Sequence, residues 1–289
     1  MFSEILEIIQ SLYSRYVLGK IKNRKNVHFY LQPDTIIIAC IIWGMMNGLT
    51  TQRSIYRSVR SILVLENFTE RSRFTRLCVN LVIAIKIIWY HFVIEHANPR
   101  DHLFAIIDSF PSPLCKSVRN IRAKVLSEVA DIGYNSTKKL HFYGLKISLM
   151  VTKTGFPLIY TVTKASIHDV NMAEKLSFGC PIEKLLGDKG YISSNMQKRL
   201  LNKGIELYTP LKKNAKNSDK IDDSLLAEHR KVIETVFSSW ENLGIQNFKS
   251  RSLLGFESRL ESILLVYCLM LSKTQERYGD TLKYFLGRF

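Results

Sequence analysis

The chain has 289 residues, enough for one large domain or two smaller ones with a buried core. Hydrophobic residues make up 46% and charged residues 23%, which is typical of a globular protein and argues against intrinsic disorder. Lysine and arginine number 41 against 25 acidic residues, so the net charge of +16 favours nucleic acid as partner, although a basic protein of another role or a protein on anionic membrane stays open.

Residues 1–100 have long aliphatic patterns broken by polar clusters, which predict a helical N-terminal region. Within it Arg53, Arg57 and Arg60 recur at spacings of four and three, opposite the apolar Ile55, Val59 and Ile62. The segment 54–77 resembles a helix-turn-helix without a strict signature. We expect the three arginines to bind DNA, and a solvated basic face on a helical bundle is the alternative.

Two apolar stretches in this region need comparison with membrane spans. Residues 36–46 and 79–94 are both shorter than the roughly 18 residues that cross a bilayer, and the second contains Lys86. Glu4 and Glu7 follow Met1 where a signal peptide would have basic residues. We therefore expect buried helices, no membrane and a cytoplasmic protein.

Near Asn98-Pro99 the sequence changes from patterns that predict helices to patterns that predict strands. Residues 103–107 form a short apolar run that predicts a strand ending at Asp108. Residues 141–151 and 157–163, separated by Thr154-Gly155, predict an antiparallel hairpin.

Helices and short strands are predicted to alternate in the remainder of the chain. This order indicates an α/β fold with a mixed sheet flanked by helices, preceded by an all-α N-terminal domain. The predicted elements are a helix at 169–176, a strand at 184–186 ending before Asp188, a helix at 194–202, a strand at 206–209, a polar loop at 212–224, a helix at 225–240 and a C-terminal helix at 258–276.

Three acids occupy positions suited to chemistry. Asp108 and Asp188 follow predicted strands, and Glu234 lies in a helix beside the apolar Ile233, an unusual place for a free carboxylate. Two divalent ions can activate water or a 3′ hydroxyl for phosphodiester chemistry, and Mg²⁺ prefers carboxylate ligands. The five cysteines include no CxxC pair, so neither a zinc site nor a disulfide framework is predicted. On residue type alone, helix caps and surface acids explain the three acids equally well.

Several linked motifs occur in one order between about residue 50 and residue 272. Together they resemble the DDE transposases of bacterial insertion sequences, and specifically the branch called the nine-eighty-two family. The matching segments are Ile107–Pro111, Gly133-Tyr134, Phe142–Lys146, His168-Asp169, Gly187–Ile192, Pro210, Lys212–Asn214, Arg230–Ser238 and Arg251-Ser252 to Gly255-Phe256.

The resemblance implies an RNase H-like catalytic domain, which we place at residues 101–289 together with the C-terminal helix. It implies that Asp108 on the first strand, Asp188 after the fourth strand and Glu234 on a late helix are catalytic and bind two Mg²⁺ or Mn²⁺ ions. A related group of transposases has Tyr and Lys where this chain has Ala227 and Glu241. That group's contacts with DNA bases are therefore not carried over.

Four further basic residues are candidates for DNA contact. Arg230 lies one helical turn before Glu234, and Lys189 follows Asp188 in a glycine-containing turn. Lys139 and Lys146 lie on or near a predicted strand by the site. Solvated turn and edge lysines are the alternative for these positions. His168-Asp169 could position a metal-bound water or DNA, or Asp169 could cap a helix.

The sequence therefore predicts a transposase that binds the terminal inverted repeats of its element, cuts DNA there and joins the ends to target DNA. A homodimer or higher assembly on DNA is expected, because two ends must meet, and the bacterial nucleoid is the expected location. The alternatives are an RNase H-like nuclease, a decayed copy that only binds DNA, and a membrane protein that uses residues 79–94.

Overall fold

The computed structural model describes residues 1–65, 67–97, 103–136, 138–210, 223–248, 250–279 and 282. Residues 98–102, where the sequence predicts a domain boundary, and residues 211–222, which include most of the predicted polar loop, lie outside these ranges. The division into residues 1–100 and 101–289 stays a prediction.

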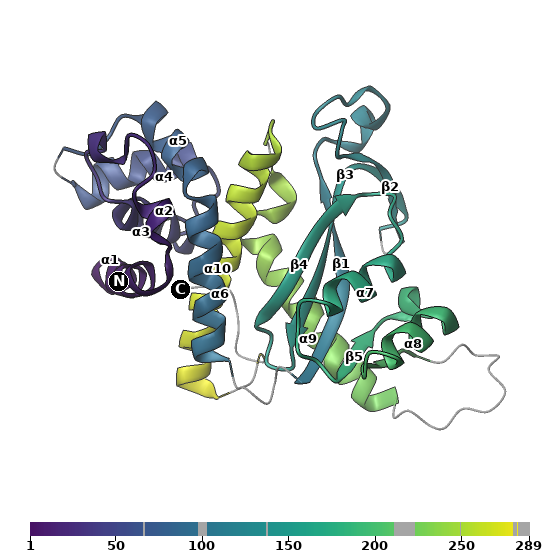
Figure 1. Cartoon of the computed structure of the whole chain (residues 1–289). Coiled ribbons are helices and arrows are strands. Elements are labelled where there is room, and N and C mark those ends of the chain that lie inside the picture. The colour runs from purple at the N-terminus through teal and green to yellow at the C-terminus, as the bar shows by residue number, and fades with distance from the viewer. Residues whose placement is uncertain are drawn as a thin grey trace.

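The N-terminal region is helical, as the aliphatic patterns predict (Figure 1). Helix α3 is buried on nearly all sides, whereas α1 buries only the face that carries Ile5, Ile9 and Leu12. The helices are α1 (Phe2–Tyr16), α2 (Gly19–Lys22), α3 (Asp34–Met46), α4 (Gln52–Ser58), α5 (Arg71–Asn80) and α6 (Val82–His96), with a 3-10 turn at Val27–Phe29 and a π-helical turn at Val59–Leu63.

The π-helical turn changes which side chain faces the core. Ile55 and Val59 are buried as predicted, but Ile62 is exposed and Leu63 packs against the core instead. A π turn holds more residues than an α turn, so the apolar face is displaced by one position. The prediction that Ile62 shares the buried face is therefore wrong.

The apolar stretch at 79–94 is divided between two helices. The chain bends by 53° between α5 and α6, at Leu81. Within the described residues, no single helix is long and apolar enough to cross a membrane, although α5 and α6 taken together meet the test of length and composition. Trp89 in α6 is buried in the core, as are Trp43 and Trp240.

A mixed sheet follows the helices. Its main path runs β2-β3-β1-β5-β6, and β4 also pairs with β3. Strand β1 is antiparallel to β3 and parallel to β5, and β5 is parallel to β6. The predicted hairpin is confirmed as β3 and β4, with Gly155 at φ 92° in its turn. The strands are β1 (Phe104–Pro113), β2 (Asp131–Asn135), β3 (Leu140–Thr152), β4 (Pro157–Lys164), β5 (Lys184–Gly187) and β6 (Glu206–Tyr208).

Strand β1 does not end at Asp108 as predicted, but continues to Pro113. Its parallel pairing with β5 stops at Ile107 opposite Gly187, while its antiparallel pairing with β3 continues to Pro113 opposite Gly144. Beyond Asp108 one edge of β1 is thus free of β5, which lets the strand accommodate prolines that cannot donate a hydrogen bond. The sequence also did not predict β2, so Asp188 follows the fifth strand in chain order rather than the fourth.

Helices cover both faces of the sheet (Figure 1). Side chains of β1 alternate between two cores: Ala105 and Ile107 face the core that includes residues of α7 and α8, and Ile106 and Phe110 face the core that includes residues of α9 and α10. The second core is continuous with the N-terminal helices, because α10 packs on α6 and α3. These four helices are α7 (Val170–Ser177), α8 (Ser194–Leu201), α9 (Asp223–Asn242) and α10 (Leu253–Tyr278).

A buried carboxylate joins the N-terminal region to the sheet through α10. Glu261 is 2% exposed and accepts hydrogen bonds from Trp89 Nε1 on α6, at 2.5 Å, and from the Tyr160 hydroxyl on β4. Lys86 Nζ lies 3.6 Å from the same carboxylate. Burial raises the pKa of Glu261, and these donors oppose the rise. Lys86, which interrupts the apolar stretch in the sequence, thus has a partner at the core boundary.

Candidate active site

Asp108 lies at the point where β1 loses its pairing with β5. Its side chain shares a face with Ile106 and Phe110, on the side of the sheet covered by α9, where Phe110 contacts Phe237. Asp108 is half-buried, and its Oδ1 accepts a hydrogen bond from the backbone N–H of Ser109 at 2.7 Å. The alternating pattern of the strand therefore places a carboxylate in an otherwise apolar row.

Asp188 follows the end of β5, next to Asp108 on the neighbouring strand. Ile107 pairs with Gly187, so the residues that come next on two parallel strands are also neighbours. Asp188 Oδ1 accepts a hydrogen bond from the N–H of Gly190 at 2.7 Å and caps the 3-10 turn Lys189–Tyr191. A Cβ at position 190 would lie 2.9 Å from this oxygen, so a residue without a side chain suits that turn.

Burial and nearby negative charges raise the pKa of Asp108. The pKa of Asp108 is raised to about 7, mainly because burial disfavours its charged form and also because Asp188 and Asp169 are negatively charged, while the Ser109 N–H and Arg230 oppose the rise. The Tyr191 ring is fully buried beside Gly187, and its hydroxyl has no hydrogen-bond partner in the described part of the chain. Burial, together with the same three aspartates, raises the pKa of Tyr191.

Asp169 is a third aspartate near this pair. It occupies the N-cap position of α7 but accepts no side-chain capping bond there. Instead Lys146 Nζ lies 3.0 Å from its Oδ1, and the same ammonium donates to the Ile167 carbonyl at 2.8 Å. A Cβ at Gly190 would be 3.9 Å from Asp169 Oδ2, so Asp169 adjoins the turn that follows Asp188. The predicted cap by the Asp169 side chain is not formed.

Glu234 and Arg230 lie one turn apart on α9. Arg230 Nε donates to Glu234 Oε1 at 3.0 Å, which confirms that they share a helix face. The Glu234 side chain is 56% exposed, so the expectation of an apolar neighbourhood for it is wrong. Its neighbour Ile233 turns the other way, into the core. Arg230 lines a small hollow together with Asp108 and Asp188.

The other predicted DNA contacts differ in their surroundings. Lys189 is exposed on the turn after Asp188, and Arg53, Arg57 and Arg60 are exposed on α4 and the π turn. Lys139 is exposed in the turn before β3, roughly 30 Å along that strand from the residue that pairs with Asp108. Lys146, in contrast, has a side chain only 13% exposed and is held by Asp169. Their roles in DNA binding stay predictions.

The donor set suits a hard divalent cation. Asp108 and Asp188 are adjacent carboxylates, and a bound cation would offset both their mutual repulsion and the cost of burying their charge. Oxygen atoms are the ligands that Mg²⁺ prefers. Across the described residues, no three His, Cys, Asp or Glu side chains are grouped closely enough to hold one metal ion. Glu234 therefore stands apart from the aspartate pair, paired with Arg230.

A family model described as a transposase DDE domain matches residues 100–252. This range contains Asp108, Asp188 and Glu234. No curated protein and no solved structure matches the chain.

Proposed function

Because the chain belongs to the transposase DDE domain family, we propose that it binds the terminal inverted repeats of a mobile element, cuts DNA there and transfers the ends to target DNA. The observation that carries this proposal is the family match over a range in which two aspartates meet where the pairing between β1 and β5 stops. We also propose that the chain belongs to the branch of these transposases called the nine-eighty-two family.

Asp108, Asp188 and Glu234 are the proposed catalytic and metal-binding residues. Bound Mg²⁺ or Mn²⁺ would supply positive charge that stabilises the attacking and leaving oxygens of phosphoryl transfer. Asp108 and Asp188 would hold the ions, and Asp188 is already oriented by the Gly190 N–H. Glu234 would join them after its side chain leaves Arg230, because the described carboxylates do not otherwise form a group of three.

Two successive transfers at one site account for cutting and joining. Water attacks the phosphorus at the element end, and the phosphodiester breaks to leave a 3′ hydroxyl. That hydroxyl then attacks a phosphorus of the target DNA and displaces another 3′ oxygen. We expect a homodimer or higher assembly, since two element ends must be held together, and nucleoid DNA as the place of action.

The excess of positive charge supports DNA as the substrate of this site. Arg230 and Lys189 flank the acidic pair and are exposed, so both can contact phosphates next to the bond that breaks. The formal net charge of +16 favours release of counterions when DNA binds.

Cleavage by an Asp188→Asn variant tests the proposal. The substrate is duplex DNA from the sequence that flanks the coding region, with Mg²⁺ or Mn²⁺ present. The variant is expected to bind this DNA like the unaltered protein and to cut no strand. Retained cleavage would refute the assigned site. Pre-cut ends supplied with target DNA give joined products from a transposase and only hydrolysis from a nuclease of the same fold.

A further inference from the structure

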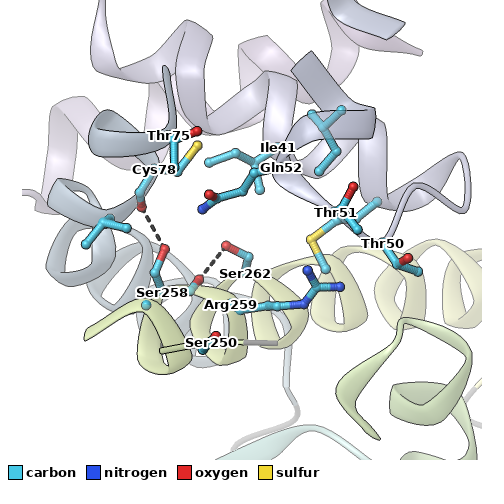
Figure 2. A pocket seen from close by; sticks show the side chains of 14 residues that line it. Ile41, Thr50, Thr51, Gln52, Thr75, Cys78, Ser250, Ser258, Arg259 and Ser262 are labelled. Atoms are coloured by element: carbon cyan, nitrogen blue, oxygen red, sulfur yellow. Dashed lines mark hydrogen bonds between the residues drawn. The ribbon is translucent and has the colours of Figure 1, made fainter. Parts of the chain in front are cut away.

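A pocket of about 520 Å³ lies where the N-terminal helices meet the first turns of α10 (Figure 2). We call it the seam pocket. Its lining includes Met45 on α3, Gln52 on α4, Thr75 on α5, and Ser250 and Arg259 from the other side. No carboxylate belongs to the described residues that line it. The seam pocket is separate from the hollow that contains Asp108 and Asp188.

Arg259 is a half-buried cation in this pocket without an acidic partner. It forms no ion pair within the described residues, and its Nε is buried without a hydrogen-bond partner there. Its guanidinium lies 5.2 Å from the centre of the Phe248 ring, and burial lowers the pKa of Arg259 to about 10. A desolvated charge without a counterion costs free energy, which a bound anion would offset.

Neutral polar side chains line the same pocket as the guanidinium. A Cβ at Gly244 would lie 3.1 Å from Thr50 Cγ2 and 3.4 Å from an Arg259 terminal nitrogen, so Thr50 and Arg259 adjoin, as Figure 2 also shows. Among the described residues, the side chains of Thr50, Gln52 and Ser250 form no hydrogen bond. Several donors are therefore available to one ligand.

Exposed arginines lie next to the lining residues in the sequence. Arg53 follows Gln52, Arg76 follows Thr75 and Arg251 follows Ser250, and all three are exposed. Positive charge on three different segments around one pocket suits a polyanion rather than a small neutral ligand. A planar guanidinium with its fork of N–H groups matches the oxygens of phosphate.

We propose that the seam pocket binds a phosphate group of the DNA backbone, with Arg259 as its principal donor and Thr50, Gln52 and Ser250 beside it. The inference rests on the proposed function, which supplies DNA as the partner. It assigns to α10 and α4 a joint contact with DNA outside the catalytic site. Inorganic phosphate shares the same chemistry, so the test separates the two sources.

The first measurement uses inorganic phosphate and the full chain. Phosphate is expected to raise the Tm of the unaltered protein above its value in chloride of equal ionic strength, since a ligand that binds only the folded state stabilises it. Arg259→Gln is expected to lose this rise. The matched control is Arg277→Gln, which removes one exposed positive charge from the far end of the same helix and is expected to keep it.

The second measurement uses duplex DNA in which single phosphates are replaced by neutral methylphosphonates. One or two replacements are expected to weaken binding to the unaltered protein and to have no effect on Arg259→Gln. That variant is expected to bind unmodified DNA about tenfold more weakly, because a charge-assisted hydrogen bond is lost. Gln52→Leu keeps Arg259 and is expected to weaken binding less, which serves as the test if Arg259→Gln does not fold.

The outcomes separate this proposal from the proposed function. A chain that binds no DNA at all would refute the proposed function. DNA binding that Arg259→Gln and Gln52→Leu leave unchanged would refute only the seam pocket as a DNA contact. If phosphate stabilisation depends on Arg259 while DNA binding does not, the pocket takes free phosphate and the DNA backbone is the wrong source.

Discussion

Arg230 donates from Nε to Oε1 of Glu234 at 3.0 Å while it also lines the hollow that holds Asp108 and Asp188. The same guanidinium therefore faces two sets of carboxylates. It lowers the pKa of Asp108, against the larger effect of burial, and it holds Glu234 through an ion pair exposed to solvent. Exposed ion pairs one helical turn apart contribute little stability, so Glu234 can leave Arg230 at small cost.

Glu234→Gln is expected to reduce strand cleavage by roughly a thousandfold, because it removes a charge proposed to act on the transferring phosphate. The free energy of unfolding should change by less than about 1 kcal/mol, since the Glu234 side chain is 56% exposed. Gel-based cleavage assays and urea unfolding measure the two effects. Glu228→Gln, at an exposed position of the same helix, is the control and should keep full activity. A Glu234→Gln variant that still cuts DNA would remove Glu234 from the site.

Most of the secondary structure could be predicted because its patterns are local. The hairpin of β3 and β4 consists of two runs separated by the turn residues Thr154-Gly155, and α7 and α8 have clear apolar faces. The wrong predictions concern the end of β1 and the turn at Val59–Leu63. The end of β1 is set by β3 rather than by the composition of β1, and the π turn at Val59–Leu63 arises in a segment that also fits an ordinary helix.

The site was predicted in unequal parts. Asp108 and Asp188 follow apolar runs in the sequence, so their meeting on adjacent strands could be expected. The ion pair between the half-buried Lys146 and Asp169 could not be predicted, because β3 and the N-terminus of α7 are far apart in the sequence and meet only in the folded protein. The place of Arg259 was also missed: in the sequence it is one arginine in a long helix, and only the packing of α10 against α3 and α5 places it in a pocket.

Asp108→Asn is expected to make the stability of the metal-free protein less sensitive to pH. The pKa of Asp108 is raised from 3.8 to about 7, so the native state holds this proton more tightly than the unfolded chain. The resulting stabilisation is fully present below about pH 4 and is lost as the pH rises through 7. Between pH 4 and pH 8 the variant should therefore gain about 4 kcal/mol or less relative to the unaltered protein.

Urea unfolding in EDTA at several pH values measures this difference. Asp131→Asn is the control, because Asp131 lies on β2, which β3 separates from β1. This variant should not reproduce the trend attributed to Asp108. Parallel pH profiles for the unaltered protein and Asp108→Asn would contradict the raised pKa.

Lys146→Met is expected to destabilise the protein by about 1 to 3 kcal/mol, because it leaves Asp169 without its cation beside Asp108 and Asp188. The double variant Lys146→Met with Asp169→Asn should recover part of that loss, since the uncompensated charge is gone. A double-mutant cycle by denaturant unfolding measures the coupling. Additive effects would show that the pair is not coupled. In that case the lysine would remain a candidate for direct DNA contact alone.

Joint replacement of Arg53, Arg57 and Arg60 by glutamine is expected to weaken DNA binding and to reduce its salt dependence. These side chains are exposed while Ile55 and Val59 of the same segment are buried, so the substitutions should leave the fold intact. Each lost phosphate contact lowers the slope of log K against log salt by about 0.9, so three lost contacts predict a change of about 2.7. Fluorescence anisotropy at several salt concentrations measures the slope. Glutamine at the exposed Lys20, Lys25 and Arg277 removes the same charge elsewhere on the chain. An equal change of slope in both triple variants would mean that Arg53, Arg57 and Arg60 act through net charge and not through contact with DNA.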